Sequence, residues 1–400
     1  MTSKPFTPDG ETRTSRIVGS VDFKFPVAPP LLEETADLFK QVSGVRCSMP
    51  FSVKVATSTG TSENVITETV NDVFNAVEST LNNWNPSSEI NKVNMMEVGE
   101  HHKMSNMLKE VVLASKEIVK LTRGAFDPSI APILAHYKLK AADCSSHALS
   151  ESSGSLDGSA DLETSRKQRA VINIWKDLLS QGYSSDPKDV RVSRKVKELL
   201  QLSQWSASFS VKNEIISKKH NDACLDLSGI TKGFAVDEIA RRLPPPCYVE
   251  WGGDIKVVGN HPTGRPWNVA VMQPRTLGQL KEGVAKARSR GQLGPVFTLF
   301  EEENDSDTGY LAVLELHDGD TVATSGDCEK VVEKNGKLYS HIINPHLGRL
   351  LEINDVTLAQ AVIVCKGSCM FADALSTVSL ILLKKLSLYP SHSLSVQCSM

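Results

Sequence analysis

A short segment in the middle of the chain, residues 226–237 (DLSGITKGFAVD), constrains the fold more than any other. Residues 224–227 have the composition of a strand end, and residues 228–229 (Ser-Gly) are typical of a turn. Apolar residues then recur at helical spacing as far as three consecutive prolines at 244–246, which end a helix. The segment therefore predicts a strand, a turn and a helix in direct succession.

This junction also has the chemistry of an anion site. Gly229 and Gly233 lack side chains and let the backbone approach a ligand, and the start of a helix offers N–H groups to an anion. Lys232 stands where its ammonium can neutralise a phosphate. Taken alone, the pattern is equally that of an ordinary glycine turn, so the rest of the chain has to decide between the two.

The organisation of the chain predicts an α+β fold with a largely antiparallel sheet and flanking helices, because short strand-like runs alternate with amphipathic helices and hairpins. One domain is predicted over 45–390, with a mostly flexible segment at 1–44, insertions at 141–168 and 275–308, and a tail at 391–400. The predicted strands and helices are strands at 53–56, 267–271, 311–316 and 338–345, and helices at 64–83, 104–122, 192–204, 230–243 and 368–383.

Composition excludes several classes of function. With 400 residues, a net charge of −3 and a pI near 6.4, the chain has no overall attraction for nucleic acid or for an anionic membrane. No apolar run is long enough to insert into a bilayer. The eight cysteines show no Cys-x-x-Cys pair, which favours free thiols in a reducing compartment. Because the first residues do not have the composition of an export leader, we expect an intracellular protein, in the cytoplasm or an organelle.

A candidate metal site lies in the last predicted helix. Asp373 and Thr377 are four residues apart and share one face, so a carboxylate and a hydroxyl point the same way. Hard oxygen donors of this kind suit Mg²⁺, which completes its shell with carbonyls, water and phosphate oxygens. The alternative is an ordinary helix with an acidic residue in its first turn.

Further candidates stand at predicted turns. His341 lies near the end of a strand-like run that turns at Asn344-Pro345, where an imidazole can accept a proton near neutral pH. Residues 252–254 (Gly-Gly-Asp) and 324–327 (Thr-Ser-Gly-Asp) are, taken alone, most simply interpreted as turns. Their occurrence in this order with the other motifs favours an enzyme that acts on a diphosphate.

With these motifs in hand, the chain resembles the ApbE family of FAD:protein FMN transferases, which move FMN from FAD onto a serine or threonine of another protein through a phosphoester bond. The resemblance runs from about residue 45 to 385. The matching pieces are, in order, Pro50-Phe51-Ser52-Val53, residues 87–94 (SSEINKVN), Gly124-Ala125-Phe126-Asp127-Pro128, Gly182-Tyr183, and residues 226–237, 252–254, 324–327, 341–345 and 372–377.

The resemblance implies a role for each candidate residue. Magnesium would be held by Asp373, Thr377 and a backbone carbonyl at Gly229; His341 would be the general base, and Asp373 would also count as catalytic. Trp84 would lie against the flavin. The residues assigned to FAD are Trp84, Gly124, Ala125, Phe126, Asp127, Lys232, Gly252, Gly253, Asp254, Ser325, Gly326 and His341.

Two departures from the family pattern stand out. Residues 47–49 (Cys-Ser-Met) replace the usual Met-Gly-Thr, a change that bears on flavin packing. Asn344 replaces an aspartate but leaves His341 and the metal pair intact, so no loss of activity is expected. The chain has no segment like the Asp-x-x-Ser-Gly-Ala-Thr acceptor motif, so the acceptor is expected to be another flavoprotein with a target Ser or Thr. Two alternatives stay open: an FAD pyrophosphatase that gives FMN and AMP, and a non-catalytic flavin-binding module.

Overall fold

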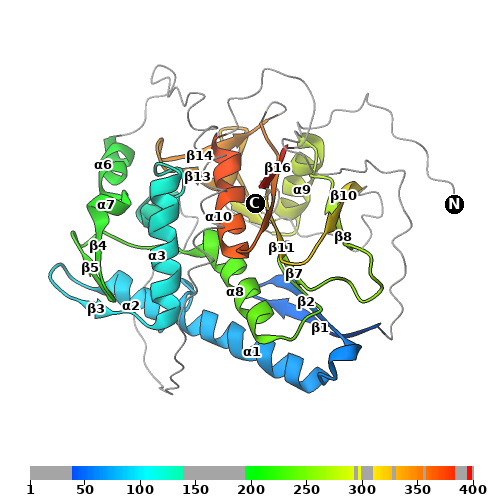
Figure 1. The fold of residues 1–400 in the computed structure, drawn as a ribbon. Coiled ribbons are helices and arrows are strands. Elements are labelled where there is room, and N and C mark those ends of the chain that lie inside the picture. Colours follow the sequence, from blue (N-terminus) through cyan, green and yellow to red (C-terminus); the bar gives the residue numbers. More distant parts are fainter. Residues whose placement is uncertain are drawn as a thin grey trace.

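A computed structural model describes residues 38–137, 194–291, 296–298, 310–326, 330–354, 357–382 and 394–398. The predicted insertion at 141–168 and the family-like pair at 182–183 lie outside these residues. Within the described part, four sheets and the helices between them confirm the predicted α+β class (Figure 1). No helix of the described residues has both the length and the apolar content needed to cross a membrane.

The largest sheet has seven strands in the order β1-β2-β6-β7-β11-β15-β16. Neighbouring strands are antiparallel except for β15 and β16, which are parallel, so the prediction of a largely antiparallel sheet is confirmed. Strand β1 begins at Phe39, inside the segment predicted as mostly flexible, and β16 lies within the predicted tail. The strands are β1 (Phe39–Arg46), β2 (Met49–Ala56), β6 (Cys247–Trp251), β7 (Asp254–Val258), β11 (Asp320–Gly326), β15 (Gln360–Lys366) and β16 (Leu394–Cys398).

Three smaller sheets flank this one. Strands β8 (Trp267–Met272) and β10 (Tyr310–Leu316) form an antiparallel pair, as both segments were predicted to be strands. The other two sheets are β14-β13-β12-β9 and β3-β5-β4. Their strands are β9 (Val296–Thr298), β12 (Lys330–Lys334), β13 (Lys337–Asn344), β14 (Arg349–Ile353), β3 (His102–Lys103), β4 (Phe209–Lys212) and β5 (Ile215–Lys218).

The helices predicted from apolar spacing are present within a few residues of their expected limits. They are α1 (Glu63–Thr80), α3 (Asn106–Leu121), α6 (Arg194–Leu202), α8 (Ser228–Arg242) and α10 (Cys369–Leu382). Shorter helices join them: α2 (Glu89–Met95), α4 (Ala131–His136), α7 (Trp205–Ser208), and the 3-10 turns η2 (Thr57–Thr59) and η3 (Pro128–Ile130). A helix not assigned from sequence, α9 (Leu277–Ser289), occupies the predicted insertion at 275–308 and packs through Leu280, Val284 and Ala287.

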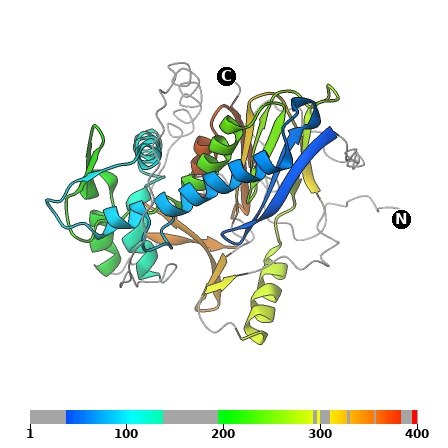
Figure 2. The ribbon, with the colours of Figure 1, turned by 90° about the horizontal axis from the view of Figure 1, so that it is seen from below.

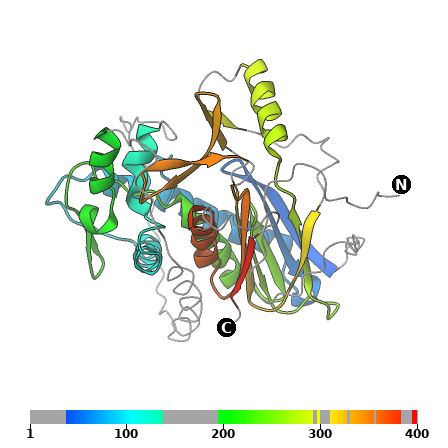
Figure 3. The ribbon, with the colours of Figure 1, turned by 90° about the horizontal axis from the view of Figure 1, so that it is seen from above.

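The seven-stranded sheet is covered differently on its two faces. Helices α1, α8 and α10 cover one face, and the β8–β10 pair covers the other (Figures 2 and 3). The alternation along β7 shows the division, since Ile255 and Val257 pack toward β8 and β10. Because side chains on a strand alternate, Asp254 and Lys256 point to the helix-covered face. Both charged groups of β7 are therefore directed at α8.

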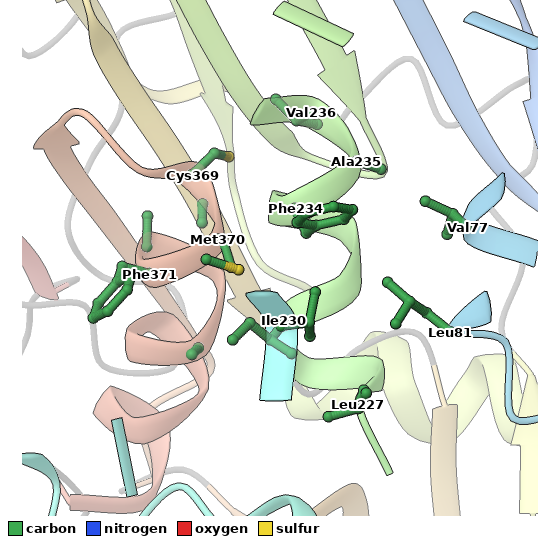
Figure 4. Packing of buried hydrophobic residues seen from close by; sticks show 14 of the residues in the cluster. Val77, Leu81, Leu227, Ile230, Phe234, Ala235, Val236, Cys369, Met370 and Phe371 are labelled. Carbon is green, nitrogen blue, oxygen red and sulfur yellow. The ribbon is translucent and has the colours of Figure 1, made fainter. Parts of the chain in front are cut away.

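Helices α8 and α10 lie side by side at the centre of the helical layer, with Phe234 of α8 and Met370 of α10 in one apolar cluster (Figure 4). Their close approach depends on Gly233. A Cβ atom built there would lie 2.3 Å from the carbonyl oxygen of Cys369 and 2.7 Å from Cα of Met370. Gly233 is thus a helix-packing glycine, and the prediction that it admits a ligand to the backbone is wrong.

The contrast between the two glycines of α8 gives a stability prediction. Gly233→Ala forces the helices apart, and we expect it to lower the free energy of unfolding by about 3 kcal/mol or more, the upper range for overpacking a core. Gly229→Ala is the matched control, because its Cβ would meet only Cε2 of Phe126 at an ordinary 3.5 Å. We expect thermal melts to show a large fall in Tm for the first variant and little change for the second; equal melts would contradict this packing.

The strand predicted before α8 is not formed. Residues 223–227 have no strand partner; instead the side-chain amide of Asn94 accepts from N–H of Leu225 at 2.7 Å and donates to its carbonyl at 3.0 Å. Asn83 also donates to that carbonyl, at 2.7 Å. Side-chain amides therefore replace the neighbouring strand, and Ser228 and Gly229, predicted as a turn, are already the first residues of α8.

Candidate active site

Three charged side chains meet in the layer between the sheet and the helices. The ammonium of Lys232 on α8 lies 2.6 Å from Oδ2 of Asp254 on β7 and 3.1 Å from Oδ1 of Asp373 on α10. The backbone N–H of Gly233 donates to the other carboxylate oxygen of Asp373 at 3.1 Å. Strand β7, helix α8 and helix α10 thus each contribute one charged side chain to the same cluster.

The trio places two acidic side chains against one basic side chain. Asp254 is fully buried and Asp373 nearly so, while the side chain of Lys232 is 20% exposed. Burial disfavours the charged form of Lys232, but the two carboxylates outweigh it and raise its pKa. Burial, and next the charge of Asp373, raises the pKa of Asp254 well above its ordinary value. Two acidic groups therefore compete for one ammonium, and the buried surroundings oppose the charged form of Asp254.

Hydroxyl groups extend the polar centre along α10. Oγ of Ser325, at the end of β11, lies 3.0 Å from Oγ1 of Thr377 and 2.6 Å from Oγ of Ser376. Asp373 and Thr377 share a face of α10, as predicted, and that face looks toward β11 and α8. Ser376 was not singled out from sequence, although it stands next to Thr377 in the same motif; its hydroxyl also donates to the carbonyl of Asp373 at 2.8 Å.

The Gly252-Gly253 pair forms the turn between β6 and β7. Both residues have positive φ, +56° and +84°, the conformation of a tight two-residue hairpin turn that favours glycine. A Cβ atom on Gly252 would meet Sδ of Met49 at 2.9 Å and Cδ of Lys232 at 3.5 Å. The turn therefore directs Asp254 toward Lys232 and makes room for the Lys232 stem. Met49, one of the departures from the family pattern, borders it.

The loop predicted to line the flavin pocket lies beside the start of α8. Cε2 of Phe126 is 3.5 Å from the Cβ position of Gly229, and the carbonyl of Pro128 accepts from N–H of Asp226 at 2.6 Å. Gly124 has φ +82°, and its Cβ position lies 3.5 Å from Cε1 of His346 in the turn after β13. The start of α8 and the turn after β13, which are far apart in the sequence, thus both lie against the Gly124–Asp127 loop.

Asp127 has a structural role in that loop. Its carboxylate accepts from N–H and Oγ of Ser129 at 2.9 and 2.5 Å and from N–H of Trp205 at 2.9 Å. Burial raises its pKa.

Trp84 follows α1, and its side chain is 57% exposed. The neighbouring Asn83 forms hydrogen bonds with the segment that leads into α8. Contact of Trp84, Ala125 and Asp127 with a flavin stays a prediction.

His341 occupies an irregular part of β13. The pairing of β13 with β14 shifts register between Tyr339 and Ile343, and a bulge of this kind changes the direction of a side chain. The next residue, Ile342, packs against Leu380 and Ile381 of α10, so β13 lies along that helix. The catalytic role of His341 stays a prediction.

Asn344 keeps the function that an aspartate would have in the turn after β13. Its Oδ1 accepts from N–H of His346 at 3.0 Å and of Leu347 at 3.2 Å. Both bonds need only an acceptor oxygen, which an amide and a carboxylate share. The departure from the family pattern at this position therefore leaves the turn intact.

The donor set fits a divalent cation. The oxygen donors of the centre are the carboxylate of Asp373 and the hydroxyls of Thr377 and Ser325, which are hard ligands. Each oxygen of Asp373 accepts one bond and retains capacity for another. Within the described residues no three His, Cys, Asp or Glu side chains cluster as a metal site. Any cation there would therefore need hydroxyls, carbonyls and substrate oxygens in addition to the carboxylate of Asp373.

Comparison with known proteins identifies the family. The model of the ApbE family matches residues 47–389. The chain belongs to the ApbE family. Two curated relatives named FAD:protein FMN transferase are those of Chlamydia pneumoniae, 26% identical with 84% of this chain and 83% of that protein covered, and of Vibrio cholerae, 22% identical with 84% and 79% covered.

Solved structures agree on the fold of this ApbE-family chain. The apo flavinyl transferase ApbE of Pseudomonas stutzeri superimposes with a TM-score of 0.58 at 21% identity, covering 86% of this chain and 84% of that one. The flavin transferase ApbE of Vibrio cholerae gives 0.56 at 21% identity, covering 86% and 87%. The family and the ApbE-like fold predicted from the motifs are thereby confirmed, as is the prediction of an enzyme of this transferase type.

Proposed function

We propose that this protein transfers FMN from FAD to a Ser or Thr hydroxyl of an acceptor protein and releases AMP. The observation that carries the proposal is the meeting of Lys232, Asp254 and Asp373 beside the hydroxyls of Ser325 and Thr377. The naming of the curated relatives as FAD:protein FMN transferases supports the same activity. FAD is the substrate, and Mg²⁺ is the cofactor proposed to be held by Asp373, Thr377 and the carbonyl of Gly229.

The reaction follows from the chemistry of a diphosphate. The acceptor oxygen attacks the phosphorus on the FMN side, a new P–O bond forms, and the P–O bond to AMP breaks. His341 takes the proton from the attacking hydroxyl. When bound, Mg²⁺ would neutralise diphosphate charge and make AMP a better leaving group. Lys232 and the N–H of Gly233 hold Asp373 in place, so its carboxylate is already oriented to hold the metal.

A direct test is to incubate the protein with FAD, Mg²⁺ and a lysate of its source. We expect an FMN adduct on a lysate protein, seen as a fluorescent band after denaturation and as a mass increase on a Ser or Thr peptide. AMP release without acceptor would instead support the pyrophosphatase reaction on the same site. FAD binding without AMP under any condition would support a binding module and overturn the proposal.

His341→Ala should separate binding from chemistry. We expect the variant to bind FAD as the unaltered protein does, and to transfer FMN about 10²–10⁴-fold more slowly, the usual contribution of a general base. Fluorescence quenching of FAD measures the first quantity, and single-turnover AMP release measures the second. His317→Ala is the control, since His317 is an exposed residue after β10 paired with Asp320. If FAD affinity and transfer rate fell by the same factor in His341→Ala, His341 would have a role in binding FAD and not in the chemical step.

A further inference from the structure

Asp237 is a motif residue that the proposed reaction does not use. It lies on α8, one turn beyond Gly233, and its carboxylate is directed at the start of α10. Oδ1 accepts from N–H of Cys369 at 3.1 Å, and Oδ2 accepts from N–H of Met370 at 3.0 Å. The hydroxyl of Ser368 also donates to Oδ2, at 3.1 Å. A side chain of one helix thus caps the N-terminus of another.

Lys256 completes this arrangement from the sheet. Its ammonium lies 2.6 Å from Oδ1 of Asp237 and 2.5 Å from the carbonyl oxygen of Gly367. Burial disfavours the charged form of Lys256, but Asp237 outweighs this and raises its pKa. Asp237 and Lys256 are both largely buried, which makes the geometry of their contacts well defined.

The two ion pairs between β7 and α8 have opposite polarity. Asp254 of β7 faces Lys232 of α8, and two residues along the strand Lys256 faces Asp237, five residues along the helix. A slip of α8 along β7 in one direction would bring Asp254 toward Asp237, and a slip in the other direction would bring Lys256 toward Lys232. Like charges in a buried layer are strongly unfavourable, so the alternation specifies one register.

On α10, the capped residues and the metal-site residue are one turn apart. Cys369 and Met370 are fixed by Asp237, and Asp373 is fixed by N–H of Gly233 and by Lys232. One helical turn advances about 5.4 Å. The cap on the first turn of α10 therefore sets the position of Asp373 along the helix axis. It also sets the position of Thr377, which lies one turn later.

The geometry points to Asp237 and Lys256 as positioning residues that set the axial place of α10, and with it the place of Asp373 and Thr377 in the metal site. The inference rests on the proposed function only where it concerns metal binding. The effect on the position of Asp373 is tested on the protein without metal or substrate. Asp237→Asn tests it, because an amide offers one acceptor oxygen where a carboxylate offers two, and turns an N–H₂ group toward other donors.

The amide signal of Gly233 reports the position of Asp373 without metal or substrate. The sequence contains two Lys-Gly pairs, 232–233 and 366–367. Labelling lysine with ¹³C at the carbonyl and glycine with ¹⁵N therefore leaves two signals in a filtered NMR spectrum, and Lys366→Arg removes the one from Gly367 and so assigns Gly233. In Asp237→Asn we expect the Gly233 proton to move upfield, because its bond to a carboxylate is weakened. A Gly233 signal at the wild-type position in the folded variant overturns the inference.

Two further variants keep the test decisive. Leu314→Ala, in the core on the far side of the sheet, is the control for lost stability alone; it should lower Tm and leave Gly233 unmoved. Lys256→Gln keeps the capping carboxylate and removes one of its four donors. We expect a smaller upfield shift of Gly233 there, so the inference remains testable even if Asp237→Asn does not fold. An unmoved signal in Lys256→Gln would then contradict it.

Metal affinity gives a second readout. Free Mn²⁺ measured by its EPR signal needs no turnover, and we expect its Kd to rise about tenfold in Asp237→Asn, the usual cost of losing a group that orients a ligand. Leu314→Ala should retain the wild-type Kd. If the unaltered protein binds no Mn²⁺ even with FAD present, the metal of the proposed function is refuted, whereas the Gly233 shift still decides the positioning role. Wild-type Kd in a folded Asp237→Asn would overturn the inference.

Discussion

Asp373→Ala should abolish metal-dependent turnover, with a fall in FMN transfer of about a thousandfold or more. A bound metal contributes several kcal/mol to the stabilisation of a phosphoryl transition state, and each 1.4 kcal/mol is a factor of ten. The substitution removes the one carboxylate that the proposed metal shares with Lys232 and N–H of Gly233. Steady-state AMP release across a range of Mg²⁺ concentrations measures the effect, and excess Mg²⁺ should not restore the rate.

The matched control for this prediction lies two turns along the same helix. Ser379 is fully buried on α10, and its hydroxyl bonds the carbonyl of Leu375 within the helix. Ser379→Ala should retain transfer within a few-fold, because that bond only competes locally with the helix. If Asp373→Ala turned over normally at saturating Mg²⁺, the metal site would have to be sought elsewhere.

Lys232→Met should be the most destabilising single change at the site. It leaves Asp254 and Asp373 buried near each other without their shared cation. Removing one partner of a buried ion pair costs about 3–5 kcal/mol, because the remaining charge is uncompensated. We expect a large fall in Tm and in the urea midpoint.

A second substitution distinguishes charge from lost packing. Lys232→Met with Asp254→Asn removes one basic and one acidic group together, and we expect it to recover most of the lost stability. If the double variant melted no higher than Lys232→Met, the loss would come from the Lys232 stem that packs against Gly252 rather than from its ammonium. A coupling energy of about 2 kcal/mol or more in the double-mutant cycle would support the electrostatic account.

Sequence patterns predicted the parts of the fold that depend on local periodicity. Helices α1, α8 and α10 follow from apolar spacing, and the three prolines at 244–246 end α8 as expected. The placement of Asp373 and Thr377 on one face needed only the helical repeat. In α9 the same spacing was present at Leu277, Leu280 and Val284, but the charged residues around it led to a prediction of surface insertion alone.

Features that depend on distant partners could not be predicted. Residues 224–227 have the composition of a strand, yet Asn83 and Asn94 satisfy their backbone from more than a hundred residues away. Gly233 was predicted to serve a ligand because nothing local shows that the backbone of Cys369 fills the space beside it. Lys232 was assigned to a phosphate; its two carboxylate partners come from segments 22 and 141 residues further on. Its contact with phosphate stays a prediction.

The trio at the centre has a consequence for biosynthesis. Its members come from α8, β7 and α10, and α10 is made long after the other two. Until α10 emerges from the ribosome, Gly233 and the carboxylate of Asp237 lack the residues of α10 that they contact in the folded protein. The trio can therefore assemble only after most of the chain has been synthesised, and a chain that stops before α10 cannot form it.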